Sequence, residues 1–237
     1  MESALDIKNL NKSYKDFGVK NVSFSLPSGA IMGLVGPNGA GKTTIIKSIL
    51  GLNRFEAGEV FIFGQNDSGL ASEMLGVVTD NTLYDDEWKV IEIEKVMKLF
   101  CKNWNQDKYD GLLKQFGISK KKRVKELSRG MNVKLMIAVA LSHDAKLLVL
   151  DEPTSGLDPV ARDEICELLL EYARHGGSVL FSTHITEDLE KIADYITFVL
   201  NGEIVFSEQK EELGKKYQEA SLSEIIVSVS KGGGKCA

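Results

Sequence analysis

The stretch GPNGAGKTT, residues 36–44, has the residue types and spacing of a loop that binds phosphate, since it matches G-x-x-x-x-G-K-[ST]. Glycines let backbone N–H groups converge on phosphate oxygens, while Lys42 would neutralise the β- and γ-phosphates and Thr43 would offer its hydroxyl to Mg²⁺. A chance glycine-rich turn is the alternative. It is disfavoured because the loop follows an apolar run and opens a helical pattern. The residues predicted to bind nucleotide are Gly36, Pro37, Asn38, Gly39, Ala40, Gly41, Lys42, Thr43 and Thr44.

Polar side chains also end two further apolar runs. LLVLDE, residues 147–152, ends in Asp151, which we expect to hold Mg²⁺ through water, and in Glu152, which would orient and deprotonate the attacking water. Two acids at a strand end can be a solvated turn, but the phosphate loop upstream disfavours that. SVLFSTH ends in His184. A lone His is more often structural, yet three strand ends with polar chemistry favour a γ-phosphate contact by His184.

Strands and helices alternate around these groups. Apolar runs at residues 30–36, 147–151 and 178–183 predict buried strands, and the alternation in VSFSL predicts a strand with one buried face. A helix is predicted from Pro159 to a stop near Gly176. From about Glu87 to Glu126 the pattern is helical, which indicates a helical insert in an α/β chain. Asn201-Gly202 favours a hairpin turn.

Composition narrows the class of protein. The 237 residues are 43% hydrophobic and 27% charged, as in ordinary globular proteins, and can bury a sizeable core. The net charge of −5 argues against broad nucleic-acid binding. Three cysteines without metal or disulfide spacing fit a reducing cytosol. We see neither a signal peptide nor an apolar run near the ~20 residues that cross a bilayer, so any membrane role would go through a partner.

The stretch KELSRGMNVKL, residues 125–135, starts a helix in an unusual way. Ser128 is a suitable N-cap, but Arg129 adds positive charge to a helix end that is already positive, and Gly130 is costly in a helix. A phosphate loop, a helical insert, LSRGM, LLVLDEPTSGLD and a strand-end His follow in the order seen in ATP-binding cassette (ABC) ATPases. The chain resembles that family from about Leu5 to Tyr217.

The resemblance assigns roles to residues that their own patterns left open. It implies that LSRGM (residues 127–131) is the signature stretch, whose Ser128 and Gly130 would contact the γ-phosphate of ATP held by a second nucleotide-binding domain. Arg129 would then lie beside that triphosphate. Tyr14 stands where the family places an aromatic that stacks on adenine. The implied dimer-contact loop (residues 155–158) consists of Ser155, Gly156, Leu157 and Asp158.

Two departures from the family pattern affect the site. The common signature is Leu-Ser-Gly-Gly-Gln, and this chain has Arg129 and Met131 at the third and fifth places. The family also usually has a Gln at the place of Asp80, where it touches Mg²⁺, the water and the transport channel. Asp80 could bind Mg²⁺ as well, but it adds negative charge near ATP.

The predicted fold is α/β: a P-loop NTPase core of mainly parallel sheet, with an antiparallel β subdomain and a helical insert. We expect one domain over residues 1–237. The β subdomain and the phosphate-loop core would occupy 1–81 and the helical insert about 82–127. The signature helix and the remaining core would occupy 128–217, and a tail 218–237.

The resemblance implies an ATP-hydrolysing subunit of an ABC transporter, with ATP and Mg²⁺ as cofactors and no nucleic-acid partner. It would be cytoplasmic, held on the inner face of the cell membrane by integral membrane subunits, and would pair with a second nucleotide-binding domain. ATP would close the dimer and hydrolysis would reopen it, with export favoured over import. Two alternatives stay open: a cytosolic ABC-type ATPase of an assembly or repair machine, and a binding-only regulatory domain.

Overall fold

A computed structural model describes residues 2–66, 73–79, 82–218 and 220–231 of the chain. A six-stranded sheet with the order β5-β6-β7-β3-β8-β9 forms its centre. The strands are β3 (Ile31–Val35), β5 (Leu75–Val78), β6 (Leu147–Asp151), β7 (Ser178–Thr183), β8 (Tyr195–Leu200) and β9 (Glu203–Gln209). All neighbours pair in parallel except β8 and β9, which form the hairpin predicted at Asn201-Gly202. The predicted α/β fold is confirmed.

The register of the sheet brings three loops to one edge. Asp151 of β6 pairs with Ser182 of β7, and Val35 of β3 pairs with Thr183 of β7. The residues that follow these strands therefore leave the sheet side by side. They are Gly36, Glu152 and His184. This edge is where ligands bind in open parallel sheets.

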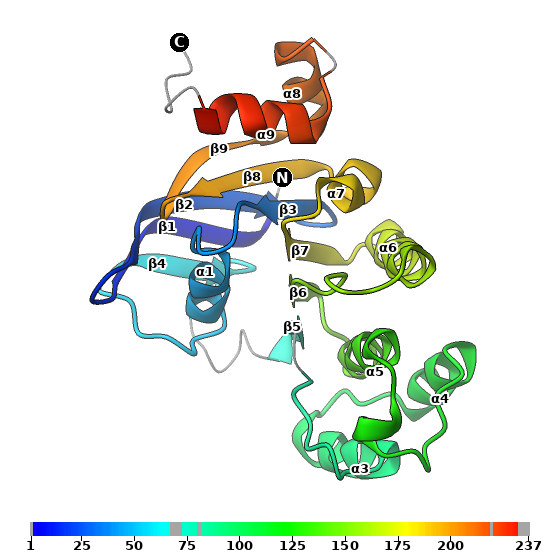
Figure 1. Ribbon diagram of the computed structural model, residues 1–237. Coiled ribbons are helices and arrows are strands. Elements are labelled where there is room, and N and C mark those ends of the chain that lie inside the picture. Colours follow the sequence, from blue (N-terminus) through cyan, green and yellow to red (C-terminus); the bar gives the residue numbers. More distant parts are fainter. Residues whose placement is uncertain (1, 67–72, 80–81, 219, 232–237) are drawn as a thin grey trace.

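The two faces of the central sheet are covered by different layers (Figure 1). One face carries α1 (Lys42–Ile49) and a three-stranded antiparallel sheet of the order β2-β1-β4, built from β1 (Ser3–Ser13), β2 (Gly18–Pro27) and β4 (Ala57–Ile62). The other face carries α5 (Arg129–Ser142), α6 (Pro159–Arg174) and α7 (Thr186–Ile192). Strand β6 is buried on both sides. Leu147 and Val149 belong to the hydrophobic core on the side of α1 and the antiparallel sheet, and Leu148 and Leu150 belong to the core on the side of α5, α6 and α7. Burial on both sides explains why the sequence of this strand, residues 147–151, is a nearly continuous apolar run.

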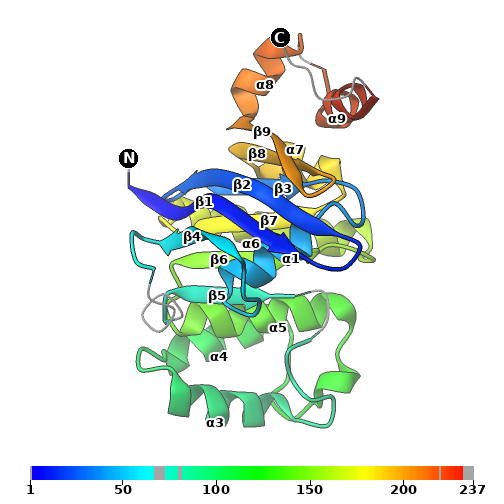
Figure 2. The same ribbon diagram turned by 90° about the vertical axis from the view of Figure 1, so that its left-hand side faces the viewer.

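The helical insert and the C-terminal helices lie at opposite ends of the molecule (Figure 2). The insert contains α3 (Val90–Phe100), α4 (Gln106–Gln115) and η1 (Val124–Glu126), and its own core includes Tyr109 and Leu113. Beyond β9 come α8 (Lys210–Lys216) and α9 (Leu222–Lys231). The segment predicted as a tail therefore contains a helix, capped where the Ser221 hydroxyl and amide both donate to Glu224. Each helix in the described part of the chain is too short or too polar to cross a bilayer.

Candidate functional site

The phosphate loop (residues 36–44) connects β3 to α1 as the sequence pattern requires. Gly41, which directly precedes α1, has φ 117°, a backbone conformation that L side chains rarely adopt. Having no side chain, Gly41 cannot cap the first amides of α1, so these N–H groups remain available to an anion. Lys42 is buried, and its Nζ donates to Gly36 O at 2.7 Å. The loop and the helix start together form a cradle for phosphate.

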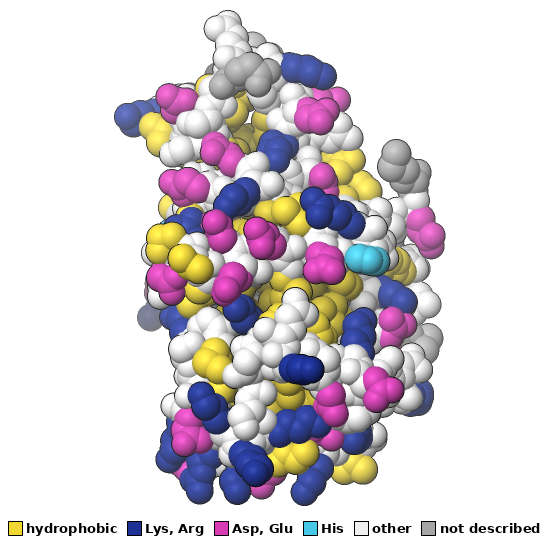
Figure 3. All heavy atoms as spheres, turned by 90° about the vertical axis from the view of Figure 1, so that its right-hand side faces the viewer, with side chains coloured by type: hydrophobic (Ala, Val, Ile, Leu, Met, Phe, Trp, Pro, Cys, Tyr) yellow, Lys and Arg dark blue, Asp and Glu magenta, His cyan; other side chains and the backbone are white. Residues whose placement is uncertain are grey.

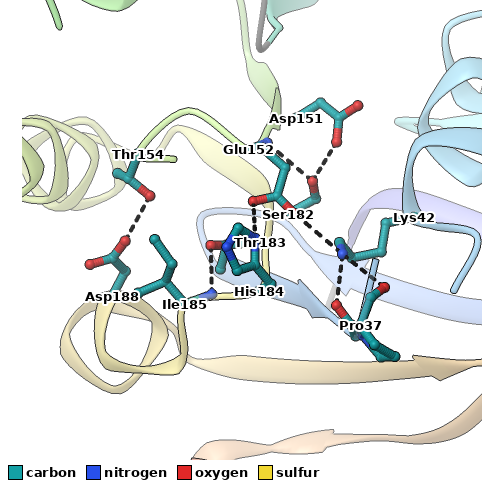
Figure 4. A network of polar contacts seen from close by, with 11 residues as sticks. Pro37, Lys42, Asp151, Glu152, Thr154, Ser182, Thr183, His184, Ile185 and Asp188 are labelled. Atoms are coloured by element: carbon teal, nitrogen blue, oxygen red, sulfur yellow. Dashed lines mark hydrogen bonds and ion pairs between the residues drawn. The ribbon is translucent and has the colours of Figure 1, made fainter. Parts of the chain in front are cut away.

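Glu152 links the phosphate loop to the end of β7 (Figure 4). Its Oε1 lies 3.3 Å from Lys42 Nζ, and its Oε2 lies 2.8 Å from His184 Nδ1. An ionised carboxylate only accepts hydrogen bonds, so the Nδ1–H of His184 donates. Glu152 also has φ 51°, a strained conformation for a residue with a side chain, of the kind that clusters at functional sites. The three side chains predicted from separate motifs thus lie together.

Asp151 has the surroundings expected of a metal-binding carboxylate. It is 8% exposed and accepts a hydrogen bond from Ser182 Oγ at 2.6 Å. No cation pairs with it among the described residues, and an ionised carboxylate buried without a cation is costly. The described residues hold no group of three His, Cys, Asp or Glu side chains placed to bind a metal by themselves. Mg²⁺ needs only one or two carboxylates together with phosphate oxygens, so Asp151 and the Thr43 hydroxyl fit it.

A cleft of about 560 Å³ opens over these groups. Its lining consists of Phe17, Asn38, Gly39, Ala40, Gly41, Lys42, Thr43, Thr44, Glu152, Ser155 and His184. Gly36, Pro37 and Asp151 lie behind this lining, in contact with it through Lys42 and Ser182. Asp80, the further metal ligand considered from the sequence, lies outside the described residues.

Two aromatic residues lie near the cleft as candidates to stack on an adenine base. Tyr14 is 48% exposed in the turn between β1 and β2, where its ring lies 5.1 Å from Lys12 Nζ, and it does not line the cleft. Phe17, which sequence reasoning missed, does line the cleft, and its ring would be 3.3 Å from a Cβ on Gly41. Tyr14 N–H donates to Phe17 O, so both belong to one turn. The only sequence signal for Phe17 was its closeness to Tyr14.

Tyr14→Ala is expected to weaken ATP binding about tenfold, ~1.4 kcal/mol, because a stacked base contributes ~1–3 kcal/mol. Binding of inorganic tripolyphosphate should be unchanged, since it has no base to stack. Calorimetry with both ligands measures this, with Phe17→Ala as the comparison. If Phe17→Ala alone weakens ATP binding, Phe17 rather than Tyr14 holds the base.

The signature stretch does not line the cleft of its own chain. Ser128 caps α5 by accepting the Met131 N–H at 3.2 Å, and it is exposed. The Arg129 guanidinium lies against the dimer-contact loop, with Nη1 3.6 Å from the position of a Cβ on Gly156. Gly130 packs against α6, since a Cβ on Gly130 would lie 3.6 Å from Ala161 Cβ. None of Ser128, Arg129 and Gly130 lines the cleft. Of the dimer-contact loop, only Ser155 does.

Other residues of the site gave no signal in the sequence. Ser182 looks like one polar residue in a buried strand, yet its hydroxyl donates to Asp151 and accepts the Glu152 N–H at 3.2 Å. Asp188 and Arg162, on α7 and α6, also join this region, since Asp188 accepts a hydrogen bond from Thr154 close after Glu152. Their pairing crosses many residues of sequence and follows only from the fold.

Known proteins resemble the chain in sequence and in fold. The model of the ABC transporter family matches residues 19–155. The chain is 34% identical over 208 residues to the lantibiotic transport ATP-binding protein SrtF of Streptococcus pyogenes, covering 86% of this chain and 90% of that protein. It is 36% identical over 200 residues to the Nod factor export ATP-binding protein I of Rhizobium leguminosarum bv. viciae, covering 81% and 64%. A solved ATP-binding subunit of an ABC transporter superposes with a TM-score of 0.86 at 26% identity, covering 96% of this chain and all of that one.

Proposed function

The chain belongs to the family of ABC transporter ATP-binding domains and is an ATPase subunit coupled to transport, and from this premise we propose where ATP is hydrolysed and what it drives. Hydrolysis takes place at a site shared between two such domains, each giving its phosphate loop to one site and its signature stretch to the other. The work is export through separate membrane subunits.

One observation carries the shared site. Lys42, Glu152 and His184 meet in one cleft, whereas the signature stretch of the same chain contributes no residue to the lining of that cleft. Ser128 and Arg129 are exposed, Ser128 caps α5 and Arg129 lies against Gly156, and neither side chain lines the cleft. A second copy, or a related domain, can bring its own signature stretch over the cleft. The dimer-contact loop borders both regions, since Ser155 lines the cleft and Gly156 touches Arg129.

The chain's own residues perform the proposed reaction in a defined order. The amides of the phosphate loop and Lys42 Nζ bind the β- and γ-phosphates, and Lys42 exchanges its contact with Glu152 for the more highly charged triphosphate. Thr43 and Asp151 would hold Mg²⁺, which neutralises charge on the phosphate oxygens when bound. Glu152 then accepts a proton from the attacking water. His184 orients the Glu152 carboxylate through Nδ1 and faces the γ-phosphate.

The membrane partner is proposed to dock in a groove beside the helical insert. This groove, of about 350 Å³, is lined by β5, the end of α3, residues 101–103 and α5. It includes Phe100, which is 79% exposed. Burial lowers the pKa of His143 and raises the pKa of the Cys101 thiol, so both lining groups stay neutral near pH 7. The lining also includes Glu73 and Lys102, whose opposite charges are paired with each other. The rest of the lining is mostly apolar, and with the exposed Phe100 it fits the apolar face of a short helix.

Support for a membrane occupant comes from the relatives. The names of SrtF and of the Nod factor protein describe ATP-binding parts of transport and export systems. In such a system the occupant of the groove is a helical segment that a membrane subunit extends to the cytoplasmic side. The ATPase would then be peripheral on the inner face of the membrane, and the membrane subunit would select the substrate.

Phe100→Glu is expected to reduce capture of the membrane partner at least tenfold, because a charge in an apolar anchor position costs ~1.4 kcal/mol or more. Leu99→Glu is the matched control, since Leu99 is 82% exposed on the same helix but does not line the groove. The measurement is affinity purification from solubilised membranes, with mass spectrometry of the captured chain. Capture of soluble assembly factors alone would support the assembly or repair hypothesis instead. Equal losses in the two variants would remove the groove from the proposal.

A further inference from the structure

Asp188 is a buried carboxylate that joins three elements of the fold. It lies on α7 and is 5% exposed. Its Oδ2 accepts a hydrogen bond from Thr154 Oγ1 at 2.7 Å, and its Oδ1 accepts from Arg162 Nη2 at 2.6 Å and Nε at 3.1 Å. Thr154 is fully buried. None of the three residues of this cluster lines the cleft.

The two partners of Asp188 stand at the two ends of the dimer-contact loop. Thr154 directly precedes Ser155, and Arg162 lies in the first turns of α6, shortly after Asp158. Asp158 is itself fixed as the N-cap of α6, where its Oδ1 accepts the Val160 and Ala161 N–H groups. One carboxylate therefore clamps the loop at both ends, while the middle of the loop reaches the surface.

Asp188 is also tied closely to His184 and Glu152 (Figure 4). Helix α7 begins at Thr186, just after His184, and the Ile185 N–H donates to Thr183 Oγ1 at 3.0 Å. Leu189, next to Asp188, packs so closely on β3 that a Cβ on Gly33 would lie 2.6 Å from it. Helix α7 is thus held against the strand that leads into the phosphate loop. On the other side, Thr154 is two residues beyond Glu152.

We propose that Asp188 is a positioning residue, which transmits contact at the dimer-contact loop to the Glu152–His184 pair. When a second domain presses on residues 155–158, the clamp moves α7 and the turn after Glu152 together. The relative placement of the Glu152 carboxylate and the His184 ring then depends on the partner. This inference rests on the proposed function, because it requires that the loop meets a second domain.

Asp188 shifts the pKa values of two neighbouring groups. The hydrogen bond to Asp188 raises the pKa of Arg162. Burial, and next the charge of Asp188, raise the pKa of the neighbouring Cys166 thiol to about 12, so this thiol stays neutral.

Asp163 and Lys191 form a second bridge between α6 and α7, but both of these residues are exposed. Figure 3 faces this helical side, where charges of both signs are spread among hydrophobic side chains.

Variants of Thr154 separate a hydrogen-bonding role from a packing role. Thr154→Ser keeps the hydroxyl and loses a methyl group, whereas Thr154→Val keeps the volume and loses the hydroxyl. Positioning through Asp188 predicts that Ser retains kcat and that Val lowers it toward the level of Asp188→Asn. A packing role predicts the reverse order, because Ser leaves a small cavity. Thermal unfolding of each variant confirms that the assays use folded protein.

The central test compares kcat, KM and monomer ATP affinity in the full chain. Asp188→Asn should lower kcat for ATP by up to about 10²-fold, the effect of a small misplacement of catalytic groups, with KM and monomer affinity close to parental. Asp163→Asn, which breaks the exposed bridge between the same two helices, should leave all three unchanged. The double variant Asp188→Asn/Thr154→Val should have a kcat no lower than that of the more impaired single variant, because both changes break the same hydrogen bond.

The outcomes distinguish the inference from the function on which it rests. Suppose that the parent protein hydrolyses ATP and that folded Asp188→Asn keeps the parental kcat. This result would overturn the inference and leave the proposed function intact. Loss of monomer ATP affinity in Asp188→Asn would overturn it too, since the residue would then serve nucleotide binding. A parent protein that does not hydrolyse ATP would remove the proposed function together with the inference.

Discussion

Glu152→Gln is expected to keep ATP binding and to slow ATP hydrolysis by about 10²–10⁴-fold. The amide has nearly the shape of the carboxylate and keeps one oxygen acceptor, but it cannot take the proton of the attacking water. Glu152 is the only carboxylate that lines the cleft within the described residues, and it lies between Lys42 and His184. A loss of this size corresponds to ~3–5 kcal/mol of barrier.

Phosphate release and calorimetric ATP affinity together check this expectation. Glu187→Gln is the matched control, because Glu187 is exposed on the first turn of α7 and does not line the cleft. It should hydrolyse ATP at the parental rate. Near-parental turnover in Glu152→Gln would remove Glu152 from the role of general base.

Ser128→Arg is expected to abolish hydrolysis while monomer ATP affinity stays close to parental. Loss of one preorganised phosphate contact typically costs ~10²–10³-fold in rate, and the Arg side chain would also fill the space of the partner's phosphate. Nucleotide affinity should be preserved because Ser128 caps α5 and lies outside the cleft of its own chain. Loss of the cap costs ~1 kcal/mol of stability, so unfolding is measured in parallel.

Calorimetry at concentrations that keep the protein monomeric gives the decisive number for Ser128→Arg. Ser119→Arg provides the control, because Ser119 is exposed in the insert and the substitution adds the same positive charge away from the signature stretch. A large loss of monomer affinity in Ser128→Arg alone would mean that the signature stretch acts on the ATP of its own chain. The shared site would then be wrong.

The central architecture could be predicted because its signals are local. The phosphate loop needs a strand, glycines and a helix start that are contiguous in sequence, and all three were found there. The meeting of Glu152 and His184 with Lys42 also followed from the sequence. Apolar runs predict parallel strands, and parallel strands deliver their carboxyl ends to one edge.

The rest depends on contacts that no local pattern encodes. Ser182 was hidden because a single polar residue in a buried strand has no periodicity to reveal its partner, Asp151. The clamp at Asp188 joins α6, α7 and the turn after Glu152, so it exists only once the sheet is assembled. Phe17 and the helix α9 were missed for the same reason, since packing on other elements decides both.

The most direct test of the shared site is the molar mass of Glu152→Gln in solution with MgATP, measured by light scattering after size-exclusion chromatography. The account predicts that the mass doubles from the 26.1 kDa of one chain when ATP is added, because slow hydrolysis traps the closed dimer. Adding Ser128→Arg to the same chain should return it to the monomer mass with ATP still bound. A Glu152→Gln chain that binds ATP and stays monomeric at high protein concentration would contradict the account, as would a dimer that the Ser128→Arg change leaves intact.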